Sequence, residues 1–375
     1  MKATKSLVVL PPMFFNSEAR TAVAFIKALR EFGVKEIVGV TPRVDYSPQV
    51  EEMLREIKDV KMSSFPVIKG PLISGPLDYF LLNIKKLIGG FDFSLNLYYV
   101  DVPVGLDASY IIYPPSALMS KKDIISRRSG IKKLYASFME KVVERTANSE
   151  HLVCSSNYIK LMVKNDFNYD CSVIYPPVDV FWKPYVAGDK EDLVVGIGKY
   201  VEPKHWEEFI NIAKIVREKN KEIKFKIIGG LDNVRSSREY FDKLKKMASD
   251  DVELLTDVEE REKWELIIKA KVVLHCMRND NFGLGVAEAM SAGAVPVMYN
   301  ATGSYMDISD QGRYGFLYNN VYEAASIILN LMMDDELYVK QKELSLQRAK
   351  EFSFSTFKKR TFNLLEQILN DRKSA

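Results

Sequence analysis

The sequence predicts an α/β fold with two domains, each a parallel β-sheet covered by helices. Its 375 residues suit two domains better than one. Short apolar runs alternate with helical stretches in both halves, which is typical of parallel strands joined by right-handed crossovers. The apolar runs are continuous, as expected of strands that are buried on both faces.

The C-terminal half shows this alternation most clearly. One helical stretch carries Trp264, Ile267 and Ile268 on a single face. We predict strands at 193–197, 225–228, 252–255, 272–275, 295–298 and 315–317. Helices are predicted at 206–219, 237–248 and 259–270. Strands that alternate with helices imply a parallel sheet with right-handed crossovers.

The N-terminal half repeats the pattern less regularly. A strand at 6–10 is followed by a helix at about 18–32, for which Gly33 is a C-terminal stop. Ser155 or Ser156 is expected to cap a helix that runs to about residue 163. Further strands are predicted at 36–40, 96–100, 110–113, 152–154 and 172–175.

Pro176 and Pro177 suggest where the first domain ends, because a proline pair cannot continue a central strand. We therefore predict an N-terminal domain at 1–180 and a C-terminal domain at 190–354. A last helix is predicted at about 357–369, after a break at 352–355.

Composition narrows the possible partners and compartment. The formal net charge of +3 is too small to indicate nucleic acid as a partner. No apolar run is long enough to cross a bilayer, and a first strand explains the N-terminal apolar stretch better than a signal peptide. Three scattered cysteines are typical of buried thiols in a reducing compartment, so we expect a cytoplasmic protein. The three histidines are too far apart for a helical zinc pair.

The most informative segment is HCMRNDNFGLGVAEAMSAGAVPV at 275–297, which has the pattern strand, loop, helix, strand. Asp280 lies in the loop, and the helix is expected to open at Asn281, Phe282 and Gly283. Free N–H groups at such a helix start bind a diphosphate in open α/β sheets. Glu288, one to two turns into the helix, could accept hydrogen bonds from both hydroxyls of a ribose. An ordinary strand-to-helix turn with a solvated Glu288 is the equally weighted alternative.

Two further segments carry weaker signals. Lys199 and Lys204 follow the first strand of the C-terminal half and could neutralise a leaving diphosphate without a metal. Solvated lysines in a surface turn are the simpler explanation of that segment alone. Gly229 and Gly230 end the next strand, where a plain turn would look the same.

Taken together, these segments resemble the retaining family 4 glycosyltransferases of GT-B fold. That family shows Gly-Arg-x4-Lys-Gly, a central Gly-x-Gly, and Glu-x-Phe-Gly-x4-Glu-Ala-x-Ala-x-Gly. Here the pieces are Gly198-Lys199 with Lys204, then Gly229-Gly230, then Asp280-x-Phe282-Gly283-x4-Glu288-Ala289-x-Ser291-x-Gly293. Order and spacing agree from Gly198 to Gly293.

The resemblance implies a fold and a role for each residue. It implies two Rossmann-like domains with sheets that face a cleft, and a closing helix at 355–375 that packs back on the N-terminal, acceptor-binding domain. Catalytic roles fall to Lys199 and Lys204 on the diphosphate and to Asp280 on the transferred sugar. The donor-binding residues implied are Gly198, Gly229, Gly230, Asn281, Phe282, Gly283, Leu284 and Glu288. Family members need no bound metal or other cofactor.

Within the family, FGLGVAEAMSAG and SVIYPPVDVF most resemble the α-1,2-mannosyltransferases of the dolichol-linked oligosaccharide pathway. This similarity implies GDP-mannose as the donor and a glycan or lipid-linked acceptor, with a UDP-hexose still open. The chain departs from the family pattern at Asp280 for Glu, at Lys199 for Arg, and at His205 for Gly. The glycine-rich loop that usually follows the first strand is absent.

The segment 120–145 is basic, with eight cations against three anions, and carries an apolar stripe. Such a segment could dock on anionic lipid at the cytoplasmic membrane face, although an ordinary amphipathic helix packed on the domain is the favoured alternative.

Two other functions remain possible, a nucleotide-sugar epimerase and a non-catalytic nucleotide-sugar-binding protein. An epimerase would need carboxylate acid and base groups at the sugar, and Asp280 alone is evident. A dehydrogenase is disfavoured, since no GxGxxG follows the first strand.

Overall fold

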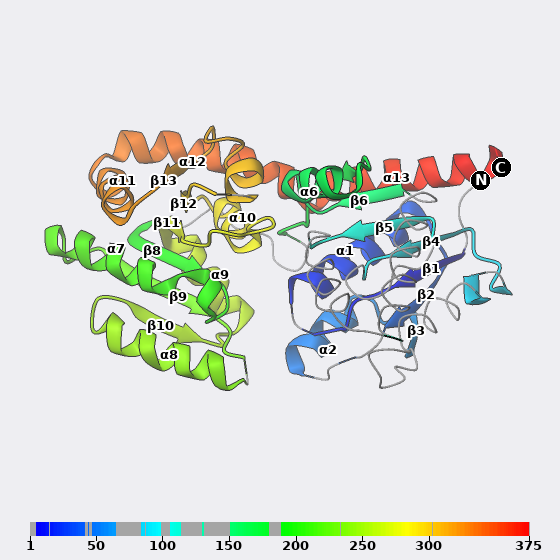
Figure 1. Ribbon diagram of the computed structural model, residues 1–375, viewed down its shortest axis with the longest axis horizontal. Helices are drawn as coiled ribbons and strands as arrows, with labels where there is room; N and C mark the ends of the chain where they lie inside the picture. The colour runs from blue at the N-terminus through cyan, green and yellow to red at the C-terminus, as the bar shows by residue number, and fades with distance from the viewer. Residues whose placement is uncertain are drawn as a thin grey trace. The chain divides into compact units, whose positions relative to one another are not determined.

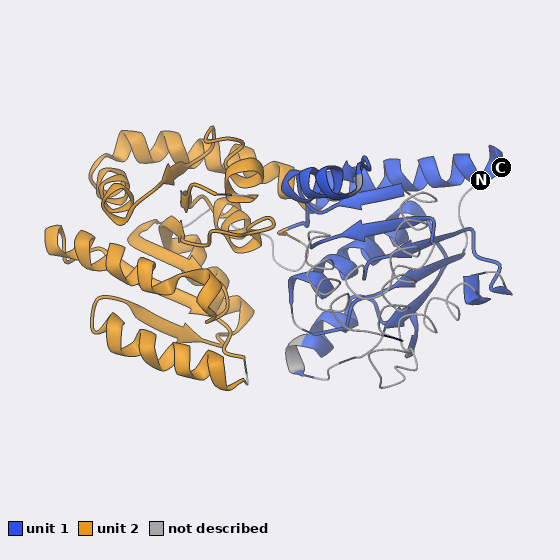
Figure 2. Cartoon of the chain, viewed as in Figure 1, with its two compact units in different colours: residues 1–177, 354–375 blue, residues 178–353 orange. Residues whose placement is uncertain are grey.

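The computed structural model describes residues 5–14, 16–41, 47–64, 84–86, 88–98, 106–113, 151–179, 189–232, 234–301 and 303–374, and the single positions 44 and 130. The chain divides into two compact units, residues 1–177 with 354–375 and residues 178–353 (Figure 2). The boundary at 177/178 lies close to the predicted end of the first domain. Of the predicted basic segment 120–145, only Gly130 is described.

Unit 1 contains a seven-stranded sheet in the order β3-β2-β1-β4-β5-β6-β7, in which every recorded pairing is parallel (Figure 1). Its strands are β1 Lys5–Val9, β2 Glu36–Thr41, β3 Lys61–Ser64, β4 Phe93–Asn96, β5 Ala108–Ile111, β6 His151–Cys154 and β7 Ser172–Val173. Its described helices include α1 Ser17–Phe32, α2 Pro48–Arg55, α6 Asn157–Phe167 and α13 Phe354–Ser374.

Helix α1 has the ends that the sequence indicates. The Asn16 side chain accepts a hydrogen bond from the Ala19 amide at 2.8 Å, and Gly33 ends the helix with φ +104°. The buried face of α1 packs against α13, where the rings of Phe25 and Phe357 lie 4.7 Å apart. The last helix of the chain thus belongs to unit 1.

Unit 2 contains a six-stranded parallel sheet in the order β10-β9-β8-β11-β12-β13. Its strands are β8 Glu191–Ile197, β9 Lys224–Gly229, β10 Glu253–Thr256, β11 Ala270–His275, β12 Val295–Tyr299 and β13 Phe316–Tyr318. Its helices are α7 Trp206–Lys219, α8 Arg235–Ala248, α9 Glu260–Lys269, α10 Leu284–Ser291, α11 Val321–Met333 and α12 Asp335–Ala349, with short turns η1 Glu202–Lys204, η2 Ser304–Ile308 and η3 Lys350–Phe352.

The helices of unit 2 form two groups around the sheet. Helix α7 packs with α8 and α11, whereas α10 packs with α9 and α12. Trp206, Phe209 and Tyr200 are fully buried on the α7 side, together with apolar residues of β8, β9 and β11. The predicted α/β fold with two parallel sheets is therefore confirmed.

Several predicted boundaries are wrong in detail. Strands β4 and β5 begin three and two residues earlier than predicted, and α10 begins after Gly283 rather than at Asn281. Helices α2, α11 and α12 and strand β3 were not predicted.

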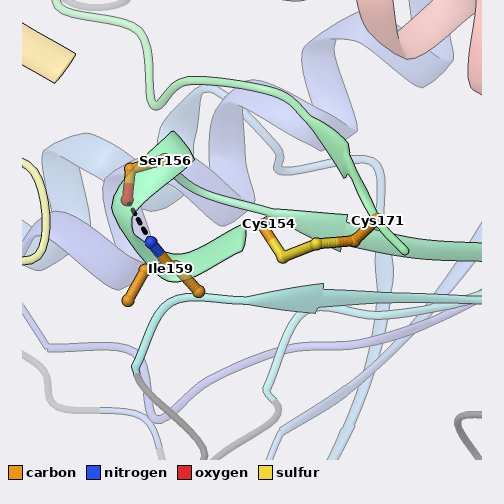
Figure 3. The surroundings of a disulfide bond; sticks show 4 residues. All are labelled: Cys154, Ser156, Ile159 and Cys171. Atoms are coloured by element: carbon orange, nitrogen blue, oxygen red, sulfur yellow. Dashed lines mark hydrogen bonds between the residues drawn. A yellow bond between two sulfur atoms is a disulfide. The ribbon is translucent and has the colours of Figure 1, made fainter. Parts of the chain in front are cut away.

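The prediction of buried thiols is wrong for two of the three cysteines. Cys154 at the end of β6 and Cys171 just before β7 form a disulfide across neighbouring strands, next to Ser156, which caps α6 (Figure 3). Cys276 is a free, buried thiol. The cysteine argument for a reducing compartment is thereby lost.

Among the described residues, no helix combines the length and apolar character needed to span a membrane.

Gly198 and Gly229 allow the ends of β8 and β9 to lie very close together. Gly198 has φ +151°, and its amide donates to the Ile228 carbonyl at 3.0 Å. A Cβ on Gly229 would lie 2.1 Å from the Gly198 carbonyl oxygen. At Gly230 the nearest atom to an added Cβ, Asp257 Oδ1, is 3.6 Å away. Only the first of the two neighbouring glycines is sterically required.

We therefore predict that Gly229→Ala lowers the free energy of unfolding by about 2 kcal/mol or more, because backbone cannot yield as a flexible side chain can. Gly230→Ala, the matched control, should change it by less than about 1 kcal/mol. Urea unfolding followed by circular dichroism measures both values, and equal losses would show that the close approach is not the constraint.

Candidate functional site

The candidate residues gather where the sheet of unit 2 reverses its winding. Strands β8 and β11 are neighbours, but the chain leaves β8 towards β9 on one side and leaves β11 towards β12 on the other. The two outgoing loops diverge at the carboxyl ends of these strands, which is where ligands bind in open α/β sheets. Lys199 and Lys204 lie in the first loop and Asp280 in the second.

The two predicted lysines point to different partners. Lys199 Nζ lies 2.9 Å and 3.2 Å from the carboxylate oxygens of Asp232, after β9, and its side chain is 56% exposed. Lys204 ends η1, and its stem lies beside Gly198. Lys204 Nζ lies 3.9 Å from Asp280 Oδ2, with both side chains largely buried. The structure thus brings Lys204, but not Lys199, into an ion pair with the β11–α10 loop.

Asp280 is surrounded by groups that favour its charged form. Its Oδ2 lies 2.8 Å from His275 Nε2, and its Oδ1 accepts a hydrogen bond from the Phe282 amide at 3.2 Å. Burial raises the pKa of this carboxyl, but Lys204, His275 and the Phe282 amide together hold the pKa below its usual value. Asp280 is therefore a negatively charged side chain with a fixed position in the β11–α10 loop.

Helix α10 begins with backbone N–H groups that no side chain caps. Its N-cap is Gly283, with φ +103°, a conformation that glycine adopts without strain. The amides of Leu284 and Gly285 begin the helix, where the helix dipole favours an anion. A Cβ on Gly285 would lie 2.9 Å from Ile197 Cγ2, so this glycine seats the start of α10 against the end of β8.

The remaining predicted residues of this loop have structural contacts. The Phe282 side chain is buried edge-to-face against Phe352, with ring centroids 5.2 Å apart. Asn281 is half-buried, and its backbone lies under Gly303, where a Cβ would be 2.8 Å from the Asn281 carbonyl carbon. The Gly303 amide also donates to the Asp280 carbonyl at 3.0 Å. Gly303 is thus required for the loop conformation, and no pattern in the sequence singled it out.

Glu288 is not the solvated side chain of the alternative interpretation. It is 2% exposed, and its Oε2 lies 3.2 Å from Lys263 Nζ on α9. Because buried charges are normally paired, Lys263 is the cation that allows this carboxylate to be buried. The sequence placed Lys263 on a helix but gave no sign of this pairing.

A second ion pair joins the β11–α10 loop to helix α7. Arg278, in the β11–α10 loop, contacts the Glu208 carboxylate of α7 and donates to the Cys276 carbonyl at 2.6 Å. Tyr318 donates to the other Glu208 oxygen at 2.8 Å, and the Arg278 guanidinium stacks 3.9 Å from the Tyr299 ring centroid. Together with Lys204 and Asp280, this pair fixes the β11–α10 loop against the segment that follows β8.

No group of three His, Cys, Asp or Glu side chains with the arrangement of a metal site occurs within the described ranges. Lys199, Lys204 and Arg278 are cations that the described loops after β8 and β11 carry.

The lowered pKa of Asp280 predicts a pH dependence of stability. The unfolded chain binds the Asp280 proton more readily than the folded protein does, so the free energy of unfolding falls as the pH drops through about 4. Asp280→Asn should cost about 1–3 kcal/mol at pH 7, and the difference from wild type should shrink towards pH 3. Urea unfolding at pH 7, 5, 4 and 3 gives these values. Asp250→Asn, at an exposed position after α8, is the control, and its free energy of unfolding should follow that of wild type. If Asp280→Asn were less stable than wild type by the same amount at every pH, the lowered pKa of Asp280 would be contradicted.

Solved structures that match this chain include glycosyltransferases. HepE from Anabaena in complex with UDP matches with a TM-score of 0.74 at 14% identity, over 97% of this chain and 100% of that one. A glycosyltransferase from Rickettsia africae matches with a TM-score of 0.69 at 12% identity, over 98% of this chain and 99% of that one. At such low identity the likeness establishes the GT-B fold alone.

Curated relatives share a single description, GDP-Man:Man(3)GlcNAc(2)-PP-Dol alpha-1,2-mannosyltransferase. The one from Dictyostelium discoideum is 24% identical over 318 residues, which cover 78% of this chain and 62% of that protein. The one from Xenopus laevis is 31% identical over 203 residues, which cover 49% of this chain and 42% of that protein. The matched stretches thus span about half the length of these relatives.

Residues 181–348 match the family described as Glycosyl transferases group 1. This range includes every candidate site residue from Gly198 to Glu288, so the resemblance to glycosyltransferases predicted from their order and spacing is confirmed for this part of the chain. Unit 2 carries a glycosyltransferase group 1 domain in a chain of GT-B fold.

Proposed function

We propose that the protein is a retaining, metal-independent glycosyltransferase that moves mannose from GDP-mannose to a glycan or lipid-linked acceptor. The observation that carries the proposal is the position of Lys204 and the N-terminus of α10 on the loops that diverge between β8 and β11. A cation and free amides at such a point suit a diphosphate.

The donor diphosphate would be held by three groups from two loops. Lys204 and the amides of Leu284 and Gly285 supply positive charge without further rearrangement. Lys199 would add a second cation by exchanging Asp232 for a phosphate, which is easy because exposed ion pairs stabilise a fold only weakly. Gly198 leaves room for the Lys204 stem beside the end of β8.

The same geometry suggests a mechanism. Lys204 and the α10 amides stabilise negative charge as the nucleoside diphosphate leaves, and the sugar passes through an oxocarbenium-like state. The acceptor hydroxyl attacks from the face that the phosphate leaves, and the phosphate takes its proton, so no separate base is required. Asp280, held as an anion, would contact the transferred sugar.

The choice of mannose rests on relatives. The curated proteins named above use GDP-mannose by their descriptions, whereas HepE was solved with UDP. GDP-mannose is therefore the favoured donor and a UDP-hexose the second choice. Glu288 and the glycines Gly229 and Gly230 are assigned to the donor side, with Gly229 acting through backbone packing.

A non-catalytic nucleotide-sugar-binding protein and an epimerase are the competing functions. Asp280 is paired with Lys204 and His275 and is held charged, which suits electrostatic stabilisation better than the proton abstraction an epimerase needs. Release of nucleoside diphosphate only when acceptor is added separates transfer from binding alone.

Replacing Lys204 with Ala tests both the proposed glycosyltransferase activity and the role of Lys204 in stabilising the leaving diphosphate. A thermal-shift series with GDP, UDP and ADP sugars first identifies the donor, since a bound ligand raises apparent stability. Wild type should then release nucleoside diphosphate on addition of a mannosylated lipid-linked acceptor. Lys204→Ala should lower kcat by about a hundredfold, because the charge on the leaving diphosphate loses its main cation.

The matched control is Lys219→Ala, an exposed lysine at the far end of α7. It should leave kcat within about twofold of wild type. Near-normal turnover in Lys204→Ala would remove this lysine from the mechanism, and no turnover by wild type with any donor would reject the transferase proposal.

We also propose that the basic segment 120–145 brings the enzyme to anionic lipid at the cytoplasmic membrane face, where a lipid-linked acceptor would lie. Its net charge of +5 supports this proposal. Vesicle flotation should show binding to phosphatidylserine vesicles that is lost in about 0.5 M salt, because screening shortens the range of the attraction. A variant with Lys121, Lys122, Arg127 and Arg128 changed to Ser should not float, and equal flotation with neutral vesicles would contradict the idea.

A further inference from the structure

Glu288 is a carboxylate held inside unit 2. It lies in the second turn of α10, three residues after Gly285, and so shares the helix face that Gly285 presents to Ile197 at the end of β8. Only 2% of the residue is exposed. A carboxylate in such a place needs a cation or several hydrogen-bond donors to remain charged.

Lys263 supplies that cation from another helix. Its Nζ lies 3.2 Å from Glu288 Oε2 and 2.6 Å from Glu260 Oε1, and its side chain is 12% exposed. Glu260 also accepts a hydrogen bond from the Trp264 indole at 3.2 Å. One lysine therefore serves two carboxylates, and the Glu260–Trp264 contact fixes the α9 end of the arrangement.

Two explanations fit a buried pair of this kind. A purely structural pair would hold α9 against α10 and have no effect on what the site binds. Replacing a structural pair by apolar residues is often neutral, so a pair without another role is not required for a stable fold. The position of the Glu288–Lys263 pair favours a role in binding. Helix α10 begins at the loops proposed to hold the diphosphate, and Glu288 lies one turn after the first residue of this helix.

We propose that Lys263 is a positioning residue that holds one Glu288 oxygen, so that the carboxylate accepts hydrogen bonds from the ribose hydroxyls of the donor. Lys263 thereby gives the site its preference for ribonucleotides. This inference rests on the proposed function, because it takes the ligand to be a nucleotide sugar. A carboxylate has about four acceptor positions, which is more than a contact with one lysine uses.

The test compares ribose with a sugar that lacks both hydroxyls. Binding is measured by calorimetry for GDP or UDP, whichever wild type binds more tightly, and for the 2′,3′-dideoxy form of the same nucleotide. Wild type should prefer the ribonucleotide by about tenfold or more, because hydrogen bonds to a charged group are strong. Lys263→Met should erase the preference and leave the Kd of the dideoxy nucleotide within about twofold.

Three further variants make the result specific. Lys263→Arg keeps the charge and should restore most of the preference. Lys263→Gln keeps a hydrogen-bond donor without the positive charge, and it replaces Lys263→Met in the binding test if the Met variant does not fold. Lys269→Met is the matched control, because Lys269 lies on the same helix and pairs with Glu191 at 3.3 Å but is 55% exposed. It should bind both nucleotides as wild type does.

The possible outcomes distinguish a failure of this inference from a failure of the proposed glycosyltransferase function. If Lys263→Met weakens both nucleotides equally, or neither, the positioning role is wrong and the transferase proposal stands. If wild type binds both nucleotides equally well, Glu288 does not contact the ribose and the inference again fails alone. If wild type binds neither nucleotide, both proposals fail.

Discussion

The reversal of winding between β8 and β11 is the constraint on which the site depends. Two parallel strands lie side by side, yet their crossovers run to opposite edges of the sheet, so the loops that leave them diverge from the carboxyl ends of the two strands. Gly198 and Gly229 permit the first loop to turn sharply, and Gly283 and Gly285 permit α10 to start against β8. Lys204, Asp280 and the α10 amides owe their positions to this arrangement.

Charge is balanced locally around these loops. Lys204 forms an ion pair with Asp280, and Arg278 forms one with Glu208. Lys263 pairs with both Glu260 and Glu288. The largely buried pairs give the loops a fixed geometry before any ligand arrives, and preorganised charge is the main source of transition-state stabilisation in most enzymes. Lys199, exposed and paired with Asp232, is the cation with the most freedom to change partner.

The sequence could predict what depends on local pattern. Helix α7 has the predicted bounds 206–219, because its buried face is marked by well-spaced apolar residues. Helix α12 was missed because it is mostly polar, with Tyr338, Ser345 and Ala349 as its only buried residues. Strand β4 was displaced because the apolar run at 97–100 directly follows it, whereas the strand itself contains the buried polar residues Ser94 and Asn96.

The candidate site, like the fold, could be predicted only in part from the sequence. The order and spacing of Gly198, Lys204, Asp280 and Glu288 along the chain were enough to predict the resemblance to glycosyltransferases, whereas the binding roles of these residues stay predictions. The contacts of Asp280 with His275 and of Glu288 with Lys263 were beyond prediction, because each depends on how side chains meet after folding. The disulfide between Cys154 and Cys171 is a further case, since the two cysteines are 17 positions apart in the sequence and become neighbours only in the folded sheet.

A crystal structure with the bound nucleoside diphosphate tests the central claim most directly. The account predicts that phosphate oxygens lie within about 3 Å of Lys204 Nζ and of the Leu284 and Gly285 amides, at the carboxyl ends of β8 and β11. A diphosphate bound at another edge of the sheet, with Lys204 still paired only to Asp280, would contradict it.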